Sequence, residues 1–211
     1  MLATQVHSAA LADRIRLPFV FDPVALADDL DRVVAAAAIQ TGGNATAWID
    51  HFVPQNYDGS WSVIPLRGVA GATHPVRMIY ADPTATAFAD GPLLAHAPHI
   101  RAVLERFACP LQTVRLMRLT PGSQIKPHRD HDLAAETGAA RIHVPITTNP
   151  QVEFMLNDIR VTMAAGSAWY LRLADPHAVA NRGPCDRVHL VIDCIADAWL
   201  LDLLRASDET A

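Results

Sequence analysis

Short apolar segments with the character of β-strands fill the second half of this chain and limit the folds that it can adopt. Turn signals such as Asn157-Asp158 and Ala165-Gly166 stand between them. Short strands in such quick succession are typical of a β-sandwich or a jelly-roll barrel, so we expect a mainly β fold with flanking helices. The predicted strands cover residues 113–119, 141–147, 152–156, 159–163, 168–173, 178–181 and 188–195.

The first half of the chain predicts helices around a few strands. Residues 15–21 have the pattern of a strand, and Asp22-Pro23 then offers an N-cap and a first-turn proline to an alanine-rich helix over residues 24–39. Thr41-Gly42-Gly43 is the stop signal of this helix. Further predicted elements are a strand over residues 61–66, a short helix from Asp82-Pro83, an amphipathic helix over residues 100–107 and a last short helix from Asp197.

Length and composition indicate a single domain over residues 1–211. With 51% hydrophobic residues the chain can bury a full core, and we divide it into a helix-rich part over residues 1–110 and a β core carrying the site over residues 111–204. The net charge of −5 and the scattered Lys and Arg argue against nucleic acid as a partner. We also expect no membrane span and no signal peptide, since no apolar run approaches about 18 residues.

The cysteines indicate a reducing environment. Cys109, Cys185 and Cys194 are odd in number and form no CxxC pair, which favours the cytoplasm over a disulfide framework. Cys109 and Cys194 lie in apolar runs, so we expect both in the core rather than in catalysis.

The motif with the clearest chemistry is His128-Arg129-Asp130. Alternate residues of an extended segment face the same side, so the imidazole of His128 and the carboxylate of Asp130 point together. They form two thirds of the 2-His-1-carboxylate set that holds non-haem Fe(II). The third ligand must be a distant histidine, and His177 is the best candidate. His131 and Asp132 are an alternative to the first two, but they begin no His-x-carboxylate pair.

Cationic residues also alternate with apolar ones inside two of the predicted strands. The two runs are Arg141-Ile142-His143 and Arg187-Val188-His189. Charges are rarely buried without a partner, so these two runs strengthen the case for a metal site at His128 and Asp130.

Taken in order, the motifs of the second half resemble the aspartyl/asparaginyl β-hydroxylase family. The resemblance runs from about residue 111 to residue 204 and extends more weakly to residues 57–61. Members of this family are Fe(II)- and 2-oxoglutarate-dependent dioxygenases with a double-stranded β-helix, a jelly-roll and cupin-like fold. The resemblance therefore implies this fold and a hydroxylase that uses Fe(II), 2-oxoglutarate and O₂. The matching residues are Arg118 to Ser123, Pro127 to Asp130, Arg141 to Ile146, Gly166, Trp169, Pro176-His177, Asn181-Arg182-Gly183 and Arg187 to Asp193.

The resemblance implies that His128, Asp130 and His177 ligate iron and that Arg187 faces the far carboxylate of 2-oxoglutarate. A planar guanidinium suits that role because it can bind a carboxylate through two hydrogen bonds. Among acidic residues near Arg187, Asp186 points the other way in a strand, and Asp193 lies six residues along, about 20 Å away at the rise of a β-strand. The carboxylate of 2-oxoglutarate is therefore the better partner.

Further roles follow from the same resemblance. Arg141 and His143 share a face and would hold 2-oxoglutarate or substrate, and His189 would support them from the face of Arg187. Trp169 would pack beside the cofactor, with ordinary core packing as the alternative. Arg115 matches an inward-facing position in related proline hydroxylases and is the predicted contact for a substrate carboxylate.

The substrate does not follow from the family name. Some members, including animal aspartyl hydroxylases, lack the carboxylate ligand, whereas this chain keeps Asp130, as do relatives that resemble small-molecule hydroxylases. A free, derivatised, carrier-bound or peptidyl amino acid remains open. Two alternatives to the hydroxylase are a cupin-like metal-binding protein with 2-oxoglutarate-independent chemistry and a non-catalytic 2-oxoglutarate sensor.

Several other polar residues are expected to lie on the surface. They are His51, His74, His96, His99 and Lys126, and also Arg118, whose position in its strand is opposite in parity to that of Arg115.

Overall fold

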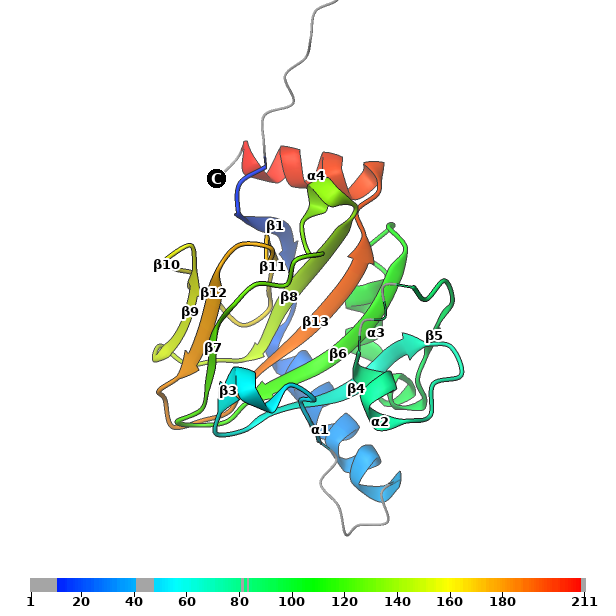
Figure 1. The fold of residues 1–211 in the computed structure, drawn as a ribbon. Coiled ribbons are helices and arrows are strands. Elements are labelled where there is room, and N and C mark those ends of the chain that lie inside the picture. The colour runs from blue at the N-terminus through cyan, green and yellow to red at the C-terminus, as the bar shows by residue number, and fades with distance from the viewer. Residues whose placement is uncertain (1–10, 41–47, 81, 83, 210–211) are drawn as a thin grey trace, which may run out of the picture.

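Two antiparallel β-sheets face each other in the computed structural model (Figure 1), which describes residues 11–40, 48–80, 82 and 84–209. The larger sheet contains β1 (Arg14–Val20), β2 (Ile49–Asp50), β4 (Trp61–Val69), β5 (Phe88–Asp90), β6 (Leu111–Leu119), β8 (Ala139–Thr147), β11 (Ser167–Leu171) and β13 (Arg187–Ile195). The smaller sheet contains β3 (Tyr57–Asp58), β7 (Gln124–His128), β9 (Val152–Leu156), β10 (Ile159–Arg160) and β12 (His177–Asn181).

From β6 onward the chain winds between the two sheets. β6, β8, β11 and β13 belong to the larger sheet, and β7, β9 and β12, which lie between them in the sequence, belong to the smaller one. The strand orders are β1-β11-β8-β13-β6-β4-β2 and β10-β9-β12-β7-β3, with β5 paired to β4. This winding is that of a double-stranded β-helix, so the expected jelly-roll fold is confirmed.

Strands from the first half of the chain complete both sheets. β1 pairs with β11, β4 pairs with β6, and β3 pairs with β7. The outer face of the larger sheet is covered by helices (Figure 1). The helices that pack on this face are α1 (Pro23–Gln40), α3 (Pro98–Leu104) and α4 (Ala198–Asp208), whereas α2 (Pro75–Ile79) contributes Ile79 to the core between the sheets. Short 3₁₀ helices lie at Pro54–Asn56, Pro92–His96 and Ala135–Thr137.

Alternation along the strands separates two cores. Leu116 on β6 and Leu190 on β13 pack on the helices, whereas their neighbours Met117 and Val191 pack between the sheets. The charged and histidine residues of β8 and β13 share the inward parity, so polar groups meet inside the barrel. They are Arg141, His143, Arg187, His189 and Asp193.

Some predicted elements differ from the structure. The strand expected over residues 159–163 stops after Arg160, because β10 pairs with β9 over two residues only. The two strands are joined by a tight turn in which Asn157 and Asp158 adopt φ angles of 49° and 61°. Strand β7 was not among the predicted strands.

No helix begins at Asp82, whose Oδ1 instead accepts a hydrogen bond from the backbone N of Thr84 at 2.9 Å. Pro83 and the predicted helix stop at Thr41-Gly42-Gly43 lie outside the described residues.

Burial agrees with the expectation for the cysteines. Cys109 and Cys194 are buried and Cys185 is exposed. None of the helices in the described part of the chain has the length and apolar character needed to cross a bilayer.

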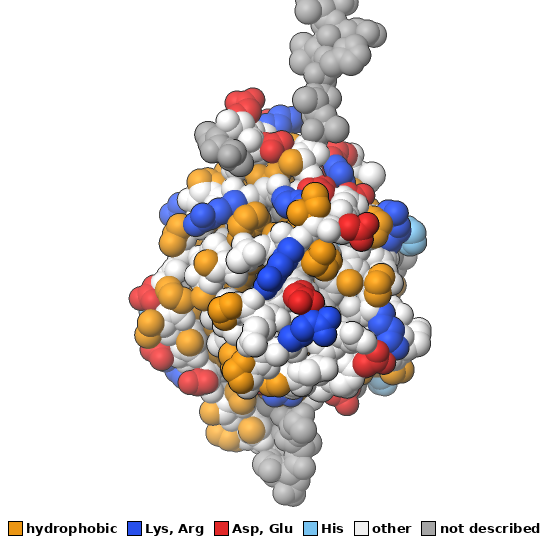
Figure 2. All heavy atoms as spheres, turned by 90° about the vertical axis from the view of Figure 1, so that its left-hand side faces the viewer, with side chains coloured by type: hydrophobic (Ala, Val, Ile, Leu, Met, Phe, Trp, Pro, Cys, Tyr) orange, Lys and Arg blue, Asp and Glu red, His pale blue; other side chains and the backbone are white. Residues whose placement is uncertain are grey.

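Figure 2 shows the molecule from the side of the smaller sheet. Basic and acidic side chains are interspersed with hydrophobic ones over this face. The ion pairs here include Arg182 with Glu153 at 2.9 Å and Lys126 with Asp58 at 2.8 Å.

Candidate metal centre and its two cavities

Three side chains that could hold a metal meet at one end of the smaller sheet. His128 ends β7, Asp130 follows two residues later, and His177 begins β12, where it lies directly opposite His128 in the strand pairing. One ligand atom from each of the three lies within 4.8 Å of the others. The structure therefore brings together the three residues that were predicted from the sequence to form a metal-binding triad.

Backbone hydrogen bonds orient both imidazole rings. Nδ1 of His128 lies 2.8 Å from the carbonyl oxygen of Lys126, and Nδ1 of His177 lies 3.0 Å from that of Asp175. A carbonyl oxygen only accepts, so each Nδ1 carries the proton and each Nε2 has a free lone pair. Burial lowers the pKa of His177 to about 4, which keeps this ring neutral near pH 7, as metal ligation requires.

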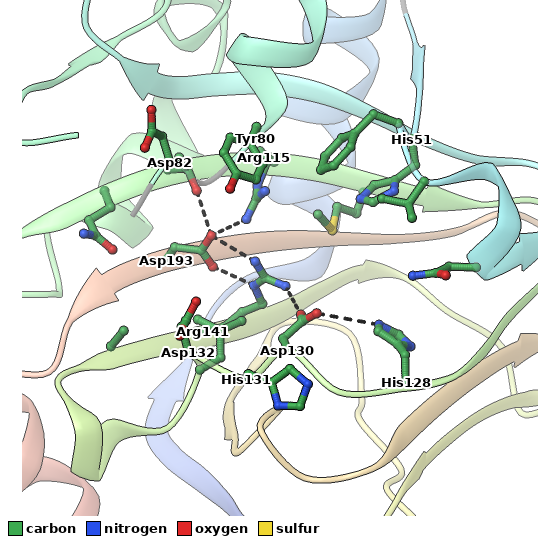
Figure 3. A pocket seen from close by; sticks show the side chains of 18 of the residues that line it. His51, Tyr80, Asp82, Arg115, His128, Asp130, His131, Asp132, Arg141 and Asp193 are labelled. Atoms are coloured by element: carbon green, nitrogen blue, oxygen red, sulfur yellow. Dashed lines mark hydrogen bonds and ion pairs between the residues drawn. The ribbon is translucent and has the colours of Figure 1, made fainter. Parts of the chain in front are cut away.

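The carboxylate of Asp130 is held at one oxygen. Its Oδ2 accepts a hydrogen bond of 2.8 Å from Nη1 of Arg141, while its Oδ1 lies 3.8 Å from Nε2 of His128 (Figure 3). The backbone N of Asp130 also donates to the carbonyl oxygen of Leu173 at 2.9 Å. Oδ1 is thus the oxygen available to a cation. Two imidazole nitrogens and one carboxylate oxygen fit a facial Fe(II) site.

A small inner cavity lies between the sheets beside this triad. It is lined by Arg187, His143 and Phe154 together with His128 and His177. The guanidinium of Arg187 is only 2% exposed, and burial lowers its pKa to about 9, so it remains a cation near pH 7. Among the described residues no carboxylate lies within ion-pair distance of Arg187, and its Nε has no hydrogen-bond partner.

Two buried histidines line up behind Arg187. Nη2 of Arg187 lies 2.8 Å from Nδ1 of His189, and Nδ1 of His143 lies 3.4 Å from the same nitrogen. Because the guanidinium only donates, Nδ1 of His189 accepts and His143 presents its Nδ1–H. Nε2 of His143 is then a lone-pair acceptor, buried and without a partner. Burial, reinforced by the charge of Arg187, lowers the pKa of both histidines well below the usual value.

A larger outer cavity of about 360 Å³ also borders His128 and Asp130 (Figure 3). Its floor holds Arg115, Arg141 and Asp193. Asp193 is 1% exposed and accepts hydrogen bonds from both arginines. Burial raises the pKa of Asp193, but the guanidinium groups of Arg115 and Arg141 outweigh it and hold this pKa well below the usual range.

Arg115 points into the barrel and Arg118 points away from it, as their parity predicts. Nη1 of Arg115 donates to the carbonyl oxygen of Ile79 at 2.7 Å, its Nη2 pairs with Asp193, and its Nε is buried without a partner. The guanidinium of Arg118 lies 4.4 Å from the ring of Trp48.

His51 is a residue of the site that the sequence reasoning missed. The prediction that it lies on the surface is wrong, because its ring stacks on Trp61 at 3.5 Å and 7° and lines the outer cavity. Its Nδ1 is buried without a partner. Burial, together with the charges of Arg115 and Arg141, lowers the pKa of His51 to about 3. The nearby aromatic residues Phe52 and Trp61 were the only sequence signal for this position.

The remaining predicted residues lie around the centre. Trp169 pairs with His143 across β11 and β8, is half-buried, and lines neither of the two cavities. Its Nε1 donates to Oγ of Ser167 at 2.9 Å. His131 and Asp132 are exposed at the rim of the outer cavity. His74, His96 and His99 are exposed as predicted, and Lys126 is in part exposed and pairs with Asp58.

Comparison with known proteins adds sequence and fold relatives. L-proline cis-4-hydroxylase of Rhizobium meliloti (strain 1021) is 27% identical over 187 residues, which are 88% of this chain and 61% of that protein. The chain thus spans less than two thirds of this relative. The structure of an oxidoreductase of the 2OG-Fe(II) oxygenase family from Burkholderia pseudomallei matches with a TM-score of 0.56 and 14% identity, over 88% of this chain and 86% of that one, which is a likeness of fold.

Family membership follows from a match that covers most of the sequence. The aspartyl/asparaginyl beta-hydroxylase family matches residues 36–197, a range that includes all three candidate metal ligands and the arginines of both cavities. This chain belongs to the aspartyl/asparaginyl β-hydroxylase family.

Proposed function

We propose that this protein is an Fe(II)- and 2-oxoglutarate-dependent dioxygenase that hydroxylates an unactivated C–H bond of an amino acid or an amino-acid-derived substrate. One oxygen atom of O₂ enters the substrate and the other enters succinate, while 2-oxoglutarate loses CO₂. The observation that carries the proposal is the buried guanidinium of Arg187, which has no carboxylate partner among the described residues and faces the cavity shared with the triad.

Nε2 of His128, Oδ1 of Asp130 and Nε2 of His177 would hold the iron. The donor set supports this assignment, because both Nε2 lone pairs are free and Oδ1 is the carboxylate oxygen that Arg141 leaves open. Iron bound there would supply activation of O₂ and the oxidising power for the hydroxylation. The protein would hold the ligands in place and exclude water.

Arg187 would bind the far carboxylate of 2-oxoglutarate. A buried cation without an anion is costly, and the planar fork of arginine matches a carboxylate. His189 occupies one N–H of the guanidinium and so fixes the direction in which the others point. His143 and Arg141 also line the inner cavity and would contact 2-oxoglutarate from its side. Trp169 would act through the packing of His143 and not by contact.

The outer cavity would bind the substrate. Arg115 retains an unpartnered Nε, which supports a contact with a substrate carboxylate. His51 and Trp61 form an aromatic wall opposite. A cavity of about 360 Å³ lies within the range of pockets, roughly 300–1,000 Å³, that take ligands larger than a single small amino acid. Both free proline, the substrate suggested by the relative's name, and larger derivatives therefore belong in the test.

The test is a turnover screen under defined conditions. The protein is loaded with Fe(II) and supplied with O₂, 2-oxoglutarate and one of a set of free, N-substituted or peptidyl amino acids. We expect succinate to form together with a product heavier by one oxygen atom. A metal-loaded protein that turns over a substrate without 2-oxoglutarate would indicate cupin-like chemistry. Tight 2-oxoglutarate binding without turnover of any compound would indicate a sensor.

A further inference from the structure

The guanidinium of Arg141 binds two carboxylates at the same time. Asp193 lies opposite Arg141 in the pairing of β13 with β8 and binds it through two hydrogen bonds, from Nε to Oδ1 at 2.6 Å and from Nη2 to Oδ2 at 3.0 Å. The third nitrogen, Nη1, donates to Oδ2 of Asp130 at 2.8 Å. Figure 3 shows the resulting row, in which Arg141 stands between Asp193 and Asp130.

We propose that Asp193 is a positioning residue for the metal ligand Asp130 and that it acts through Arg141. This inference rests on the proposed metal site and adds a residue to it. Asp193 itself touches none of the candidate ligands in the hydrogen bonds of the structure; its side chain binds Arg141, Arg115 and Thr113.

Asp193 is a rigid anchor. It lies in the central strand β13, which is paired on both sides, and its side chain is 2% exposed. Oγ1 of Thr113 donates to its Oδ2 at 2.8 Å, and Arg115 binds the same oxygen while donating to the carbonyl oxygen of Ile79. With Arg141, the partners of the Asp193 carboxylate come from β6 and β8, the strands on either side of β13, so this carboxylate has little freedom to turn.

Asp130 is the less constrained end of the row. It lies two residues beyond the end of β7, and its side chain is 31% exposed. An arginine has about 2 kcal/mol of rotamer entropy to lose, and its planar fork loses less when two of its N–H groups already share one partner. The two bonds to Asp193 therefore fix the guanidinium plane, and that plane places Nη1 at Oδ2 of Asp130. Oδ1 is left to face the triad.

Positioning and simple electrostatics make opposite predictions for Arg141. Its positive charge lies close to a site that must accept a divalent cation, so removing the charge alone would strengthen metal binding. If Arg141 instead holds Asp130 in place, its removal weakens metal binding. Partners that orient metal ligands typically change metal affinity by about 10- to 100-fold when they are mutated.

The experiment measures the affinity of the purified full-length protein for Co(II), without 2-oxoglutarate or substrate, by competition with a chelator. We expect Arg141→Gln to bind Co(II) about 10- to 100-fold more weakly than wild type. Asp193→Asn should weaken binding to a similar extent, and the double variant should be no weaker than Arg141→Gln alone, since both changes break one connection. The matched control is Asp186→Asn, an exposed carboxylate just before β13, which should leave Co(II) affinity unchanged.

A second variant covers the case in which Asp193→Asn fails to fold, since it leaves two buried cations with one fewer anion. Asp193→Asn combined with Arg115→Met removes one charge of each sign and leaves the net charge of this cluster as it was. If Asp193 positions Asp130 through Arg141, this variant should bind Co(II) more weakly than wild type. If Asp193 acts only through its charge, the Co(II) affinity should not change.

The outcomes separate this inference from the proposed function. If the wild type binds one Co(II) and Arg141→Gln binds it equally or more tightly, the positioning role is overturned and the proposed metal site is retained. The positioning role is also overturned if the losses of Co(II) affinity caused by Arg141→Gln and Asp193→Asn add up in the variant that carries both changes. Wild type that binds no Co(II) overturns the metal site and the inference together.

Discussion

The guanidinium of Arg187 donates a hydrogen bond of 2.8 Å to Nδ1 of His189, two residues along the same strand. Both side chains point into the barrel, since alternate residues of a strand share a face. The bond holds the cation toward the inner cavity and fixes the neutral tautomer of the histidine. A buried arginine is thus prepared for an anion that the described part of the chain does not supply.

Replacing Arg187 by lysine should weaken 2-oxoglutarate binding at least tenfold, about 1.4 kcal/mol, because lysine keeps the charge but loses the planar fork. Co(II) affinity should change little, since Arg187 contacts none of the three candidate ligands in the hydrogen bonds of the structure. Calorimetry on the Co(II)-loaded protein measures the 2-oxoglutarate affinity, and competition with a chelator measures the Co(II) affinity. The control is Arg182→Lys, an exposed arginine paired with Glu153. Unchanged 2-oxoglutarate affinity in a folded Arg187→Lys variant would falsify the cofactor role.

Alanine at His128, Asp130 or His177 should each abolish stoichiometric metal binding and succinate formation. Each change removes one of the three donors that this chain offers to the metal. Metal content after anaerobic loading gives the result directly. His131→Ala is the matched control, because His131 is exposed at the rim and should leave one metal per chain. If His131→Ala loses the metal while His128→Ala retains it, the ligand assignment is wrong.

The alternation of side chains within single strands predicted which residues of this site share a face. Which residues of different strands meet depends on how the strands pair. The sequence placed Arg141 with His143, and Arg187 with His189, on common faces, and the structure agrees. The sequence also excluded Asp193 as a partner for Arg187, and in the structure Asp193 pairs with Arg115 and Arg141 instead. Which arginines Asp193 meets depends on the register of β13 with β8 and β6, and a single sequence contains no direct signal for register.

His51 shows the other limit of the sequence. It lies in a loop-like stretch after β2, where no period links one residue to the next, so its turn-like surroundings suggested the surface. Packing of its ring on Trp61 brings it into the cavity. Contacts of this kind between a loop and a strand depend on the whole fold.

Replacing Arg115 by lysine should raise the substrate KM more than the 2-oxoglutarate KM, since Arg115 lines the outer cavity and not the inner one. Lysine preserves the charge that balances Asp193, which protects the fold. Steady-state kinetics with the substrate found in the turnover screen provide both constants. The comparison variant is Arg118→Lys, on the same strand but facing Trp48. Equal increases in both constants would place Arg115 in the cofactor site or in a purely structural role.

The two histidines behind Arg187 should make the apoprotein less stable as the pH falls below about 6.5. Burial and the charge of Arg187 hold the pKa of both His143 and His189 well below the usual value. The unfolded chain therefore binds protons that the folded chain does not, so the free energy of unfolding decreases as the pH drops through the unfolded pKa. For each histidine the loss between pH 7 and pH 5 is at most about 2 kcal/mol, the value reached if the ring stays neutral in the folded chain.

His189→Asn tests this relation, because the asparagine carbonyl can still accept from Arg187 but does not titrate. Urea unfolding at pH 7 and pH 5, in the presence of a chelator to exclude metals, should give this variant a smaller decrease in stability than wild type, by up to about 2 kcal/mol. His99→Asn is the control, since it removes an exposed histidine of α3. The same decrease in wild type and His189→Asn would mean that His189 is protonated in the folded protein, and the hydrogen bond from Arg187 to its Nδ1 would then have to be abandoned.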